Sequence, residues 1–407
     1  MEQLRLSHPA GAVLIGGYVN ALGLVRGLAS RGIQTAVVTT KPFDIAHRSR
    51  LVGSHDAAPD IEERPEQLVE LLERRVPEWR GWVLIPTNDA ALAALTDAHE
   101  RLCPAYRVAA PEPEAALTLL DKDAMLEAAS AAGLDVPRRY GPATEATAAA
   151  EGLEFPVIVK PLVPYRFVSR FGRKLFVADD REELRGYASR MEDAGIPGQV
   201  IELVPGPDSR ILTHCTYIDS RGEPAASLTV RKLRQNPPLY GDARVAELTA
   251  QDPELREATV ELLRRIGHRG IAIAEFKLDP RDRRPRFIEV NGRSVVYNGL
   301  LRRGGLDLGA LAWSDHVHGR PERPRTNGWP GAWIHLHPDL LYSVFHRKHR
   351  LGLSEFLEPY RRATVEAVWS ATDPAPFAAQ WVRTAREGAS AVRRRSLQER
   401  LGAPAAR

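Results

Sequence analysis

Two glutamates lie at mirror-related positions around a proline-flanked turn. Residues 270–279 and 286–293 both have strand composition. If this hairpin is symmetric about its turn, Glu275 lies opposite Glu289, and Asn291 shares their face because strand side chains alternate. Carboxylates that face each other at about 5 Å repel, so a cation between them is favoured. Mg²⁺ is commonly held by one or two carboxylates together with substrate phosphates. The hairpin therefore predicts a magnesium site formed by Glu275, Glu289 and Asn291.

Lysine is scarce in this chain, which has 49 arginines and seven lysines. A retained lysine is a candidate for a compact point charge that arginine cannot mimic. Lys160 ends the apolar strand 155–160, beside the loop expected at 163–173, where an ammonium suits polyphosphate neutralisation. An ordinary edge-strand lysine is the alternative.

The strand expected at 199–203 runs into a Pro–Gly turn. Its free backbone groups around Glu202 could recognise an adenine edge, and Asp208 could accept hydrogen bonds from ribose hydroxyls or cap a turn.

A second group of cations follows along the chain. Lys232 and Arg234 share a face of the strand expected at 225–234, and the loop 235–242 could close over a site. Arg293 extends the face of the predicted magnesium site and could stabilise developing phosphate or carboxylate charge. Cations and paired carboxylates without a covalent nucleophile suit phosphoryl transfer.

The elements that would position these groups fall into two patterns. Up to residue 110, strands at 12–15, 33–40, 82–85 and 107–110 alternate with helices at 21–31, 61–75 and 90–102. This alternation predicts an α/β, Rossmann-like parallel sheet. From residue 111 the pattern changes to α+β with antiparallel strands, and residues 316–407 contain helical segments with a short strand at 333–337. We therefore expect four parts, at 1–110, 111–195, 196–315 and 316–407.

The order of the motifs resembles the ATP-grasp superfamily over residues 10–315. The matching motifs are Asp121-Lys122, Val157–Pro161, Ile201–Gly206, Glu275 and Glu289–Arg293. The segments at 16–23, 86–89 and 231–237 resemble its carboxylate–amine ligase branch, the D-aspartate-ligase-like proteins. The resemblance implies an ATP-grasp fold of two α+β subdomains after the Rossmann-like domain, followed by a C-terminal helical extension.

The resemblance also implies roles for individual residues. Lys122 and Lys160 would contact the phosphates of ATP. The hinge that holds adenine would consist of Glu202, Leu203 and Val204, with Asp208 near the ribose. Arg293 would steady the acyl-phosphate, and Lys232 and Arg234 are the other catalytic candidates. In this family the loop after the second lysine strand is often glycine-rich, but residues 165–172 contain one glycine, so how this segment covers the phosphates stays open. Lys174 could assist there or lie on a hairpin surface.

Composition excludes several classes of protein. With 43% hydrophobic and 27% charged residues, the chain is of ordinary globular type. It has no apolar run of membrane-spanning length and no secretory signal pattern. The two cysteines predict neither a disulfide framework nor a zinc site, which fits a cytoplasmic location. The net charge of +4 comes from the segment after residue 382, so the body of the chain does not predict nucleic-acid binding.

Two other patterns in the sequence concern ligand binding. Gly16-Gly17 follows a strand, but the G-x-G-x-x-G spacing is absent and the second strand ends without an acidic residue, which disfavours a dinucleotide site. The first domain is then a platform for a carboxylate substrate, with contacts from Asn20, Asn88 and Asp89, for which loop capping is the alternative. The pairs His316/His318 and His335/His337 could chelate a metal if they lay on strands, but no cysteine or carboxylate cluster accompanies them.

The expected activity is ATP- and magnesium-dependent ligation of a carboxylate to an amine through an acyl-phosphate, giving an amide. One alternative is an enzyme that activates bicarbonate or another small acid through a carboxyphosphate-type intermediate. Another is a non-catalytic ATP-binding scaffold. Small-molecule substrates, no nucleic-acid or membrane partner and a homodimer are expected, with residues 316–407 serving as a lid, a dimer surface or a partner dock.

Overall fold

The computed structural model describes residues 10–162, 164–236, 240–345 and 350–386. The chain forms two compact units, residues 1–109 with 294–407, and residues 110–293. The four-part division expected from the sequence stays a prediction. The basic segment from residue 387 onward and the centre of the 235–242 loop lie outside the described residues. No helix in the described ranges combines the length and the apolar character needed to span a bilayer.

The first unit contains the predicted parallel sheet, in the order β3-β2-β1-β4-β5. The strands are β1 (Ala12–Ile15), β2 (Thr35–Thr39), β3 (Ser54–Ala57), β4 (Val83–Pro86) and β5 (Arg107–Val108). The helices between them are α1 (Val19–Ala29), η1 (Ala46–Arg48), α2 (Glu66–Trp79), α3 (Asp89–Asp97) and α4 (His99–Leu102). The strand β3 was not predicted, because its sequence Ser-His-Asp-Ala is polar and only half-buried at the sheet edge.

The C-terminal part of this unit contains short elements. They are α11 (Asn298–Arg303), α12 (Leu308–His318), β15 (Ala332–Ile334), α13 (Leu336–Leu340), the π-helix η3 (Leu341–Phe345), α14 (Leu353–Leu357), η4 (Glu358–Arg361) and β16 (Thr364–Glu366), with residues 375–386 also helical. Helices α11 and α12 pack on α1, and β15 pairs in parallel with β16.

The histidine pairs do not lie on strand faces. The predicted strand 333–337 is wrong at its end, because β15 stops at Ile334 and His337 belongs to α13. His316 and His318 lie on α12, where residues two apart do not share a face. In the described part of the chain, no group of three or more His, Cys, Asp or Glu side chains is arranged to hold a metal.

A buried aspartate attaches the C-terminal segment to the first helix of the same unit. Asp373 is 1% exposed and accepts hydrogen bonds from the Arg26 guanidinium at 3.1 Å and the Ser49 hydroxyl at 2.9 Å. The backbone N–H of Arg50 donates to its other carboxylate oxygen at 3.1 Å. Arg26 also donates to the carbonyl of Val368 at 2.8 Å. This segment is therefore fixed through an ion pair removed from water.

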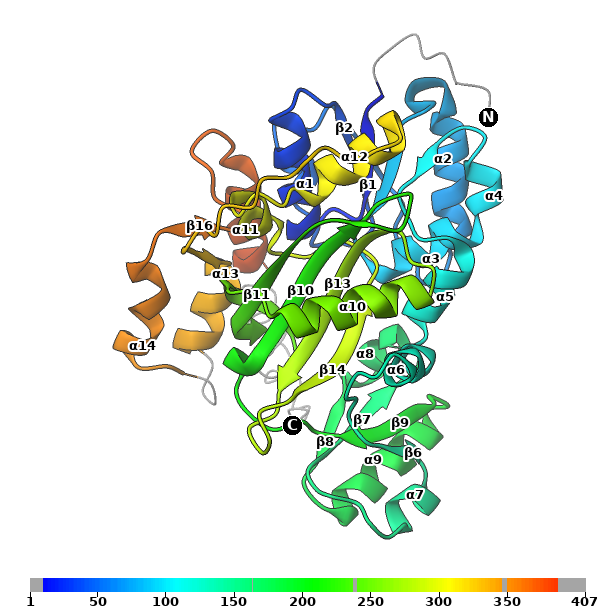
Figure 1. The fold of residues 1–407 in the computed structure, drawn as a ribbon, viewed down its shortest axis with the longest axis vertical. Helices are drawn as coiled ribbons and strands as arrows, with labels where there is room; N and C mark the ends of the chain where they lie inside the picture. Colours follow the sequence, from blue (N-terminus) through cyan, green and yellow to red (C-terminus); the bar gives the residue numbers. More distant parts are fainter. Residues whose placement is uncertain (1–9, 163, 237–239, 346–349, 387–407) are drawn as a thin grey trace, which may run out of the picture. The chain divides into compact units, whose positions relative to one another are not determined.

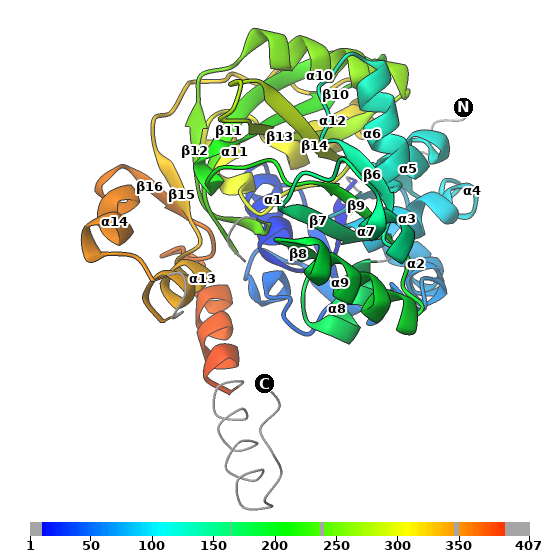
Figure 2. The ribbon, with the colours of Figure 1, turned by 90° about the horizontal axis from the view of Figure 1, so that it is seen from below.

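The second unit begins with two helices and an antiparallel sheet in the order β6-β9-β7-β8 (Figure 2). These elements are α5 (Pro113–Leu120), α6 (Lys122–Ala131), β6 (Arg139–Pro142), α7 (Glu145–Ala149), β7 (Val157–Pro161), α8 (Pro164–Phe171), β8 (Phe176–Ala178), α9 (Arg181–Asp193) and β9 (Gly198–Glu202). Helices α7 and α9 pack together over this sheet, with α9 against β8.

The segment expected as the loop 163–173 is largely helical. Helix α8 forms because Phe167 and Phe171, one turn apart, both pack on Phe176, with ring centroids 4.8 and 5.2 Å from that ring. Phe167 is fully buried. The expectation of a loop was therefore wrong here, since the scarcity of glycine reflects a helix anchored by aromatic packing.

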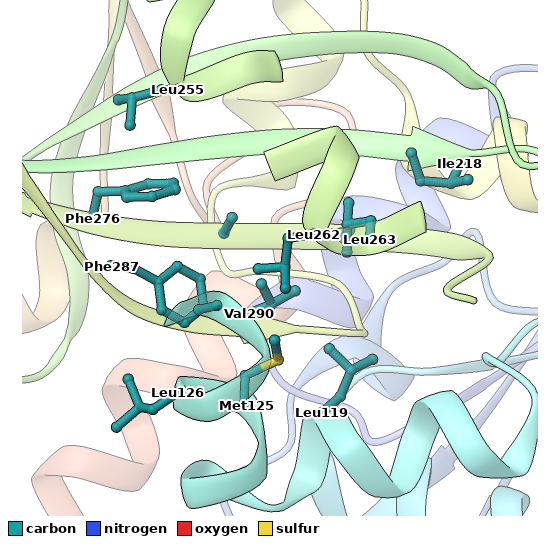
Figure 3. Close-up of a cluster of buried hydrophobic side chains, with 13 residues drawn as sticks. Leu119, Met125, Leu126, Ile218, Leu255, Leu262, Leu263, Phe276, Phe287 and Val290 are labelled. Atoms are coloured by element: carbon teal, nitrogen blue, oxygen red, sulfur yellow. The ribbon is translucent and has the colours of Figure 1, made fainter. Parts of the chain in front are cut away.

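The larger sheet of this unit has its strands in the order β14-β13-β10-β11-β12, all antiparallel. Its elements are η2 (Asp208–Arg210), β10 (Ile211–Ile218), β11 (Pro224–Asn236), β12 (Asp242–Thr249), α10 (Pro253–Arg265), β13 (Gly270–Leu278) and β14 (Pro285–Asn291). Helix α10 runs across one face of the sheet (Figure 1). The core between this face and α5, α6 and α10 includes Phe276, Phe287 and Val290 (Figure 3).

The hairpin β13–β14 has the predicted register at its functional end. Glu275 pairs with Glu289, and Ile273 pairs with Asn291. Nearer the turn the register shifts, because Phe276 pairs with Phe287 and Ile288 is the extra residue of a β-bulge. Ala274, Phe276 and Val290 face the core, which places the two glutamates on the opposite face.

Candidate functional site

Three ammonium groups surround the two facing carboxylates. Lys122 Nζ donates to Glu289 Oε2 at 2.9 Å, and Lys160 Nζ lies 3.9 Å from the same oxygen. Lys232 Nζ donates to Glu275 Oε2. The lysines come from α6, β7 and β11, so elements distant in sequence converge on the hairpin.

Local sequence fixes the position of Lys122. Asp121 ends α5 and caps α6 by accepting from the N–H groups of Asp123 and Ala124 at 2.9 and 3.0 Å, which makes Lys122 the first helical residue. Gln199 on β9 donates to the Asp123 carboxylate at 3.0 Å and pairs in register with Lys160. The start of α6 is therefore held next to the strand that carries Lys160.

Asn291 completes the acidic face of the hairpin. Its side-chain N–H donates to Glu289 Oε1 at 3.2 Å, so both oxygens of Glu289 have partners. Glu275 lies in register with Thr213 of β10 as well as with Glu289. The predicted metal-binding residues Glu275, Glu289 and Asn291 are therefore adjacent in the folded protein.

The charges on these groups follow from their neighbours. The Lys122 ammonium holds the pKa of Glu289 well below its usual range despite burial, with Lys160 adding to the effect. Burial and the nearby charge of Lys122 lower the pKa of Lys160 to about 8, against the pull of Glu289. Burial disfavours the charged form of Lys232, but the nearby Glu275 carboxylate outweighs this effect, so the pKa of Lys232 is raised. At neutral pH Glu289 is thus ionised, and the lysines present positive charge to an incoming anion.

The lowered pKa of Lys160 predicts a pH dependence of nucleotide binding. If the charged ammonium binds phosphate, the association constant for MgADP falls as pH rises through about 8, because Lys160 loses its proton. The loss reaches about tenfold by pH 9 for a single titrating group. Isothermal titration calorimetry from pH 7 to pH 10 measures it.

Two variants provide the controls for this pH dependence. Lys160→Arg keeps its charge throughout the range and should give a flat profile. Lys41→Arg, at an ion pair with Glu62 in the first unit, should keep the wild-type inflection. An inflection near pH 8 that survives in Lys160→Arg would assign the titration to another group.

The predicted adenine hinge lies where the ladder of β9 stops. Glu202 is the last residue of β9 and is in register with Val157. Leu203 and Val204 follow outside the strand, so the ladder does not use their backbone groups. The Glu202 carboxylate accepts from the backbone N–H of Arg138 at 3.0 Å and from the Arg281 guanidinium.

Asp208 already has partners on a neighbouring strand. Its two carboxylate oxygens accept from the backbone N–H and the side-chain amide of Gln235, at 2.7 and 3.0 Å. The predicted contact with ribose stays a prediction, and in this structure Asp208 connects η2 to β11.

The remaining predicted cations occupy the same unit. Arg234 is buried on β11, where the ladder to β12 is irregular between Lys232 and Arg234. Arg293 is half-buried in the bend that follows β14. Lys174 is exposed and forms an ion pair with Asp242 at 3.5 Å.

Sequence reasoning assigned no role to Lys277. It lies two residues after Glu275 on β13, in register with Ile211, and is 6% exposed. Burial lowers its pKa, with Asp208 and Glu275 acting in the opposite direction. The scarcity of lysine was the signal that could have identified it, because Lys277 is one of the few lysines the chain retains.

The predicted substrate residues belong to the first unit and have local partners. Asn20 donates to the carbonyl of Thr87 and accepts from the N–H of Ala21. Asn88 caps α3 by accepting from Ala91 at 2.8 Å, and Asp89 begins that helix. The three follow the ends of β1 and β4, where the strand order reverses, the usual ligand position in such sheets. Their role toward substrate stays a prediction.

The residues on the hairpin fit a magnesium ion. Two carboxylates and an amide offer hard oxygen atoms from adjacent strands, and phosphate oxygens commonly supply the remaining ligands. A carboxylate must be ionised to bind Mg²⁺, and the lowered pKa of Glu289 keeps it ionised at neutral pH.

Comparison with solved structures identifies the fold. Biotin carboxylase from Campylobacter jejuni superposes with a TM-score of 0.61 at 17% identity, over 80% of this chain and 74% of that one. N5-carboxyaminoimidazole synthetase from Staphylococcus aureus gives 0.61 at 15% identity over 84% and 86%. The chain has the ATP-grasp fold. An L-amino acid ligase from Bacillus licheniformis shares it, with a TM-score of 0.59 at 17% identity over 79% and 76%.

Sequence comparison finds a relative that matches part of this chain. A D-aspartate ligase of Enterococcus faecium (strain Aus0004) is 29% identical over 187 residues, which are 43% of this chain and 43% of the relative. This chain therefore spans less than half the length of that ligase. No family model matches the sequence.

Proposed function

We propose that the protein is an ATP- and magnesium-dependent carboxylate–amine ligase. The observation that carries this proposal is the pairing of Glu275 with Glu289 beside Lys122, Lys160 and Lys232. This arrangement can neutralise a triphosphate and hold a divalent ion. The partial match to a D-aspartate ligase and the fold shared with an L-amino acid ligase support the choice of reaction.

The proposed reaction has two steps. A substrate carboxylate oxygen attacks the γ-phosphorus of ATP, the bond to the β-phosphate oxygen breaks, and ADP leaves an acyl-phosphate. An amine nitrogen then attacks the acyl carbon, inorganic phosphate departs, and the nitrogen loses a proton to give the amide. Bound Mg²⁺ would supply charge neutralisation at the phosphate oxygens.

Each residue has a part in this proposal. Lys122 and Lys160 bind the phosphates, and the backbone of Glu202, Leu203 and Val204 receives adenine. Glu275, Glu289 and Asn291 hold the metal. Lys232, Arg234 and Arg293 stabilise the negative charge that develops during transfer. Asn20, Asn88 and Asp89 are proposed substrate contacts. The cytoplasmic location and the homodimer stay predictions.

A coupled screen of ADP release tests the function. Carboxylates including D-aspartate and L-amino acids are paired with amines, and products are identified by mass spectrometry. The expected result is ADP formation that requires both substrates and yields an amide. ADP formation with bicarbonate would favour the carboxyphosphate alternative, which the fold shared with biotin carboxylase makes worth including. Nucleotide binding without ADP release across the panel would favour a scaffold.

A further inference from the structure

Arg281 lies in the turn between β13 and β14 and connects that hairpin to the end of β9. Its guanidinium donates to Glu202 Oε1 and, through Nε, to both oxygens of Asp279 at 2.9 and 3.0 Å. Its backbone N–H also donates to Asp279 at 2.9 Å. One side chain therefore joins Glu202, the first residue of the predicted adenine hinge, to the hairpin that carries the glutamates proposed to bind the metal.

The surroundings of Asp279 fix the direction of this guanidinium. The carboxylate of Asp279 is fully buried, and Arg286 approaches it to 3.6 Å from the opposite strand. Arg286 also contacts Asp135 at 3.3 Å, and Arg284 contacts the same aspartate at 2.9 Å. Asp279 therefore helps to hold Arg281 in place, and Nη2 of Arg281 donates to Asp279 as well as to Glu202.

Glu202 is restrained from two sides. The Arg138 backbone N–H donates to one of its oxygens, and Arg281 donates to the other. Its side chain is 14% exposed, and its pKa is lowered by these donors although burial opposes the shift. Since charge-assisted hydrogen bonds are stronger than neutral ones, this contact can fix the backbone that follows at Leu203 and Val204.

We propose that Arg281 is a positioning residue that sets the adenine hinge at a fixed place relative to the metal-binding hairpin. The inference rests on the proposed nucleotide site. Arg281 would act through Glu202 and would touch neither the phosphates nor the metal. Its loss should weaken recognition of the adenosine part of a nucleotide while leaving the capture of phosphate by the lysines and glutamates intact.

The test compares two probes that share phosphate chemistry. Calorimetry measures the affinity of wild type, Arg281→Gln and Arg281→Lys for MgADP and for magnesium tripolyphosphate, which lacks adenosine. Arg281→Gln is expected to lose about tenfold in MgADP affinity and less than about twofold for tripolyphosphate. Arg281→Lys should recover part of the loss, since it keeps the charge but not the forked geometry.

The control is Arg264→Gln, which breaks an exposed ion pair with Glu261 on α10 and should leave both affinities unchanged. Equal losses for both probes in Arg281→Gln, or unchanged affinity for MgADP, would overturn the positioning role. A wild-type protein that binds neither probe would contradict the nucleotide site itself, and this inference with it. Melting curves without ligand show separately how much the substitution destabilises the fold.

Discussion

Replacement of Glu289 by glutamine is expected to reduce ADP formation by roughly 10³-fold, because it removes the charge of a proposed metal ligand and the counter-charge of two lysines. Glu289 contacts Lys122 at 2.9 Å and lies 3.9 Å from Lys160. The amide cannot replace the negative charge, so the proposed metal and the two lysines lose their common partner. Initial rates of ADP release, measured at saturating ATP and across a magnesium series, give the effect.

A matched control separates this loss from a general effect of losing a carboxylate. Glu261→Gln removes a glutamate that forms ion pairs with Arg264 and Arg265 on the surface of α10, and it should retain wild-type rates. Circular dichroism should show both variants folded. If folded Glu289→Gln kept full activity, the metal assignment on the hairpin would be wrong.

Replacement of Asp373 by alanine is expected to lower the free energy of unfolding by about 3–5 kcal/mol, the usual cost of removing one partner of a buried ion pair. Arg26 would keep its charge in a site where burial already lowers its pKa. The hydroxyl of Ser49 and the N–H of Arg50 would lose their acceptor as well. Urea denaturation followed by tryptophan fluorescence measures the change in the first unit.

The control for this stability effect is Glu322→Ala. Glu322 pairs with Arg31 at 2.6 Å, but both side chains are more than a third exposed, at 38% and 34%. An exposed pair contributes about 0–1 kcal/mol. Equal losses in the two variants would show that the Asp373 contacts do not act as a buried anchor.

The facing position of the two glutamates could be predicted from the sequence because two local rules agree. Strand alternation and turn symmetry together place Glu275 opposite Glu289, and the structure confirms this pairing. The alternation of strands and helices likewise predicted the parallel sheet of the first unit. Both results depend on short-range patterns that tertiary packing did not override.

Other features depend on contacts that single-sequence patterns do not encode. The strand β12 and the polar edge strand β3, which were not predicted, form ladders with the preceding strands β11 and β2. Helix α8 forms through packing of Phe167 on Phe176, across the loop that separates them. Arg281 lies in a turn rich in arginine, where only the fold distinguishes it from its neighbours.

The bulge at Ile288 lies between two parts of the hairpin that differ in register by one residue. Nearer the turn Phe276 pairs with Phe287, and beyond Ile288 Glu275 pairs with Glu289. If Ile288 took a regular paired position instead of forming the bulge, the rest of β14 would shift by one position, because a single-residue slip exchanges the two sides of a strand. Glu289 would then point into the apolar interior and Val290 toward the proposed nucleotide site, so the unpaired state of one aliphatic residue decides which side chains face that site.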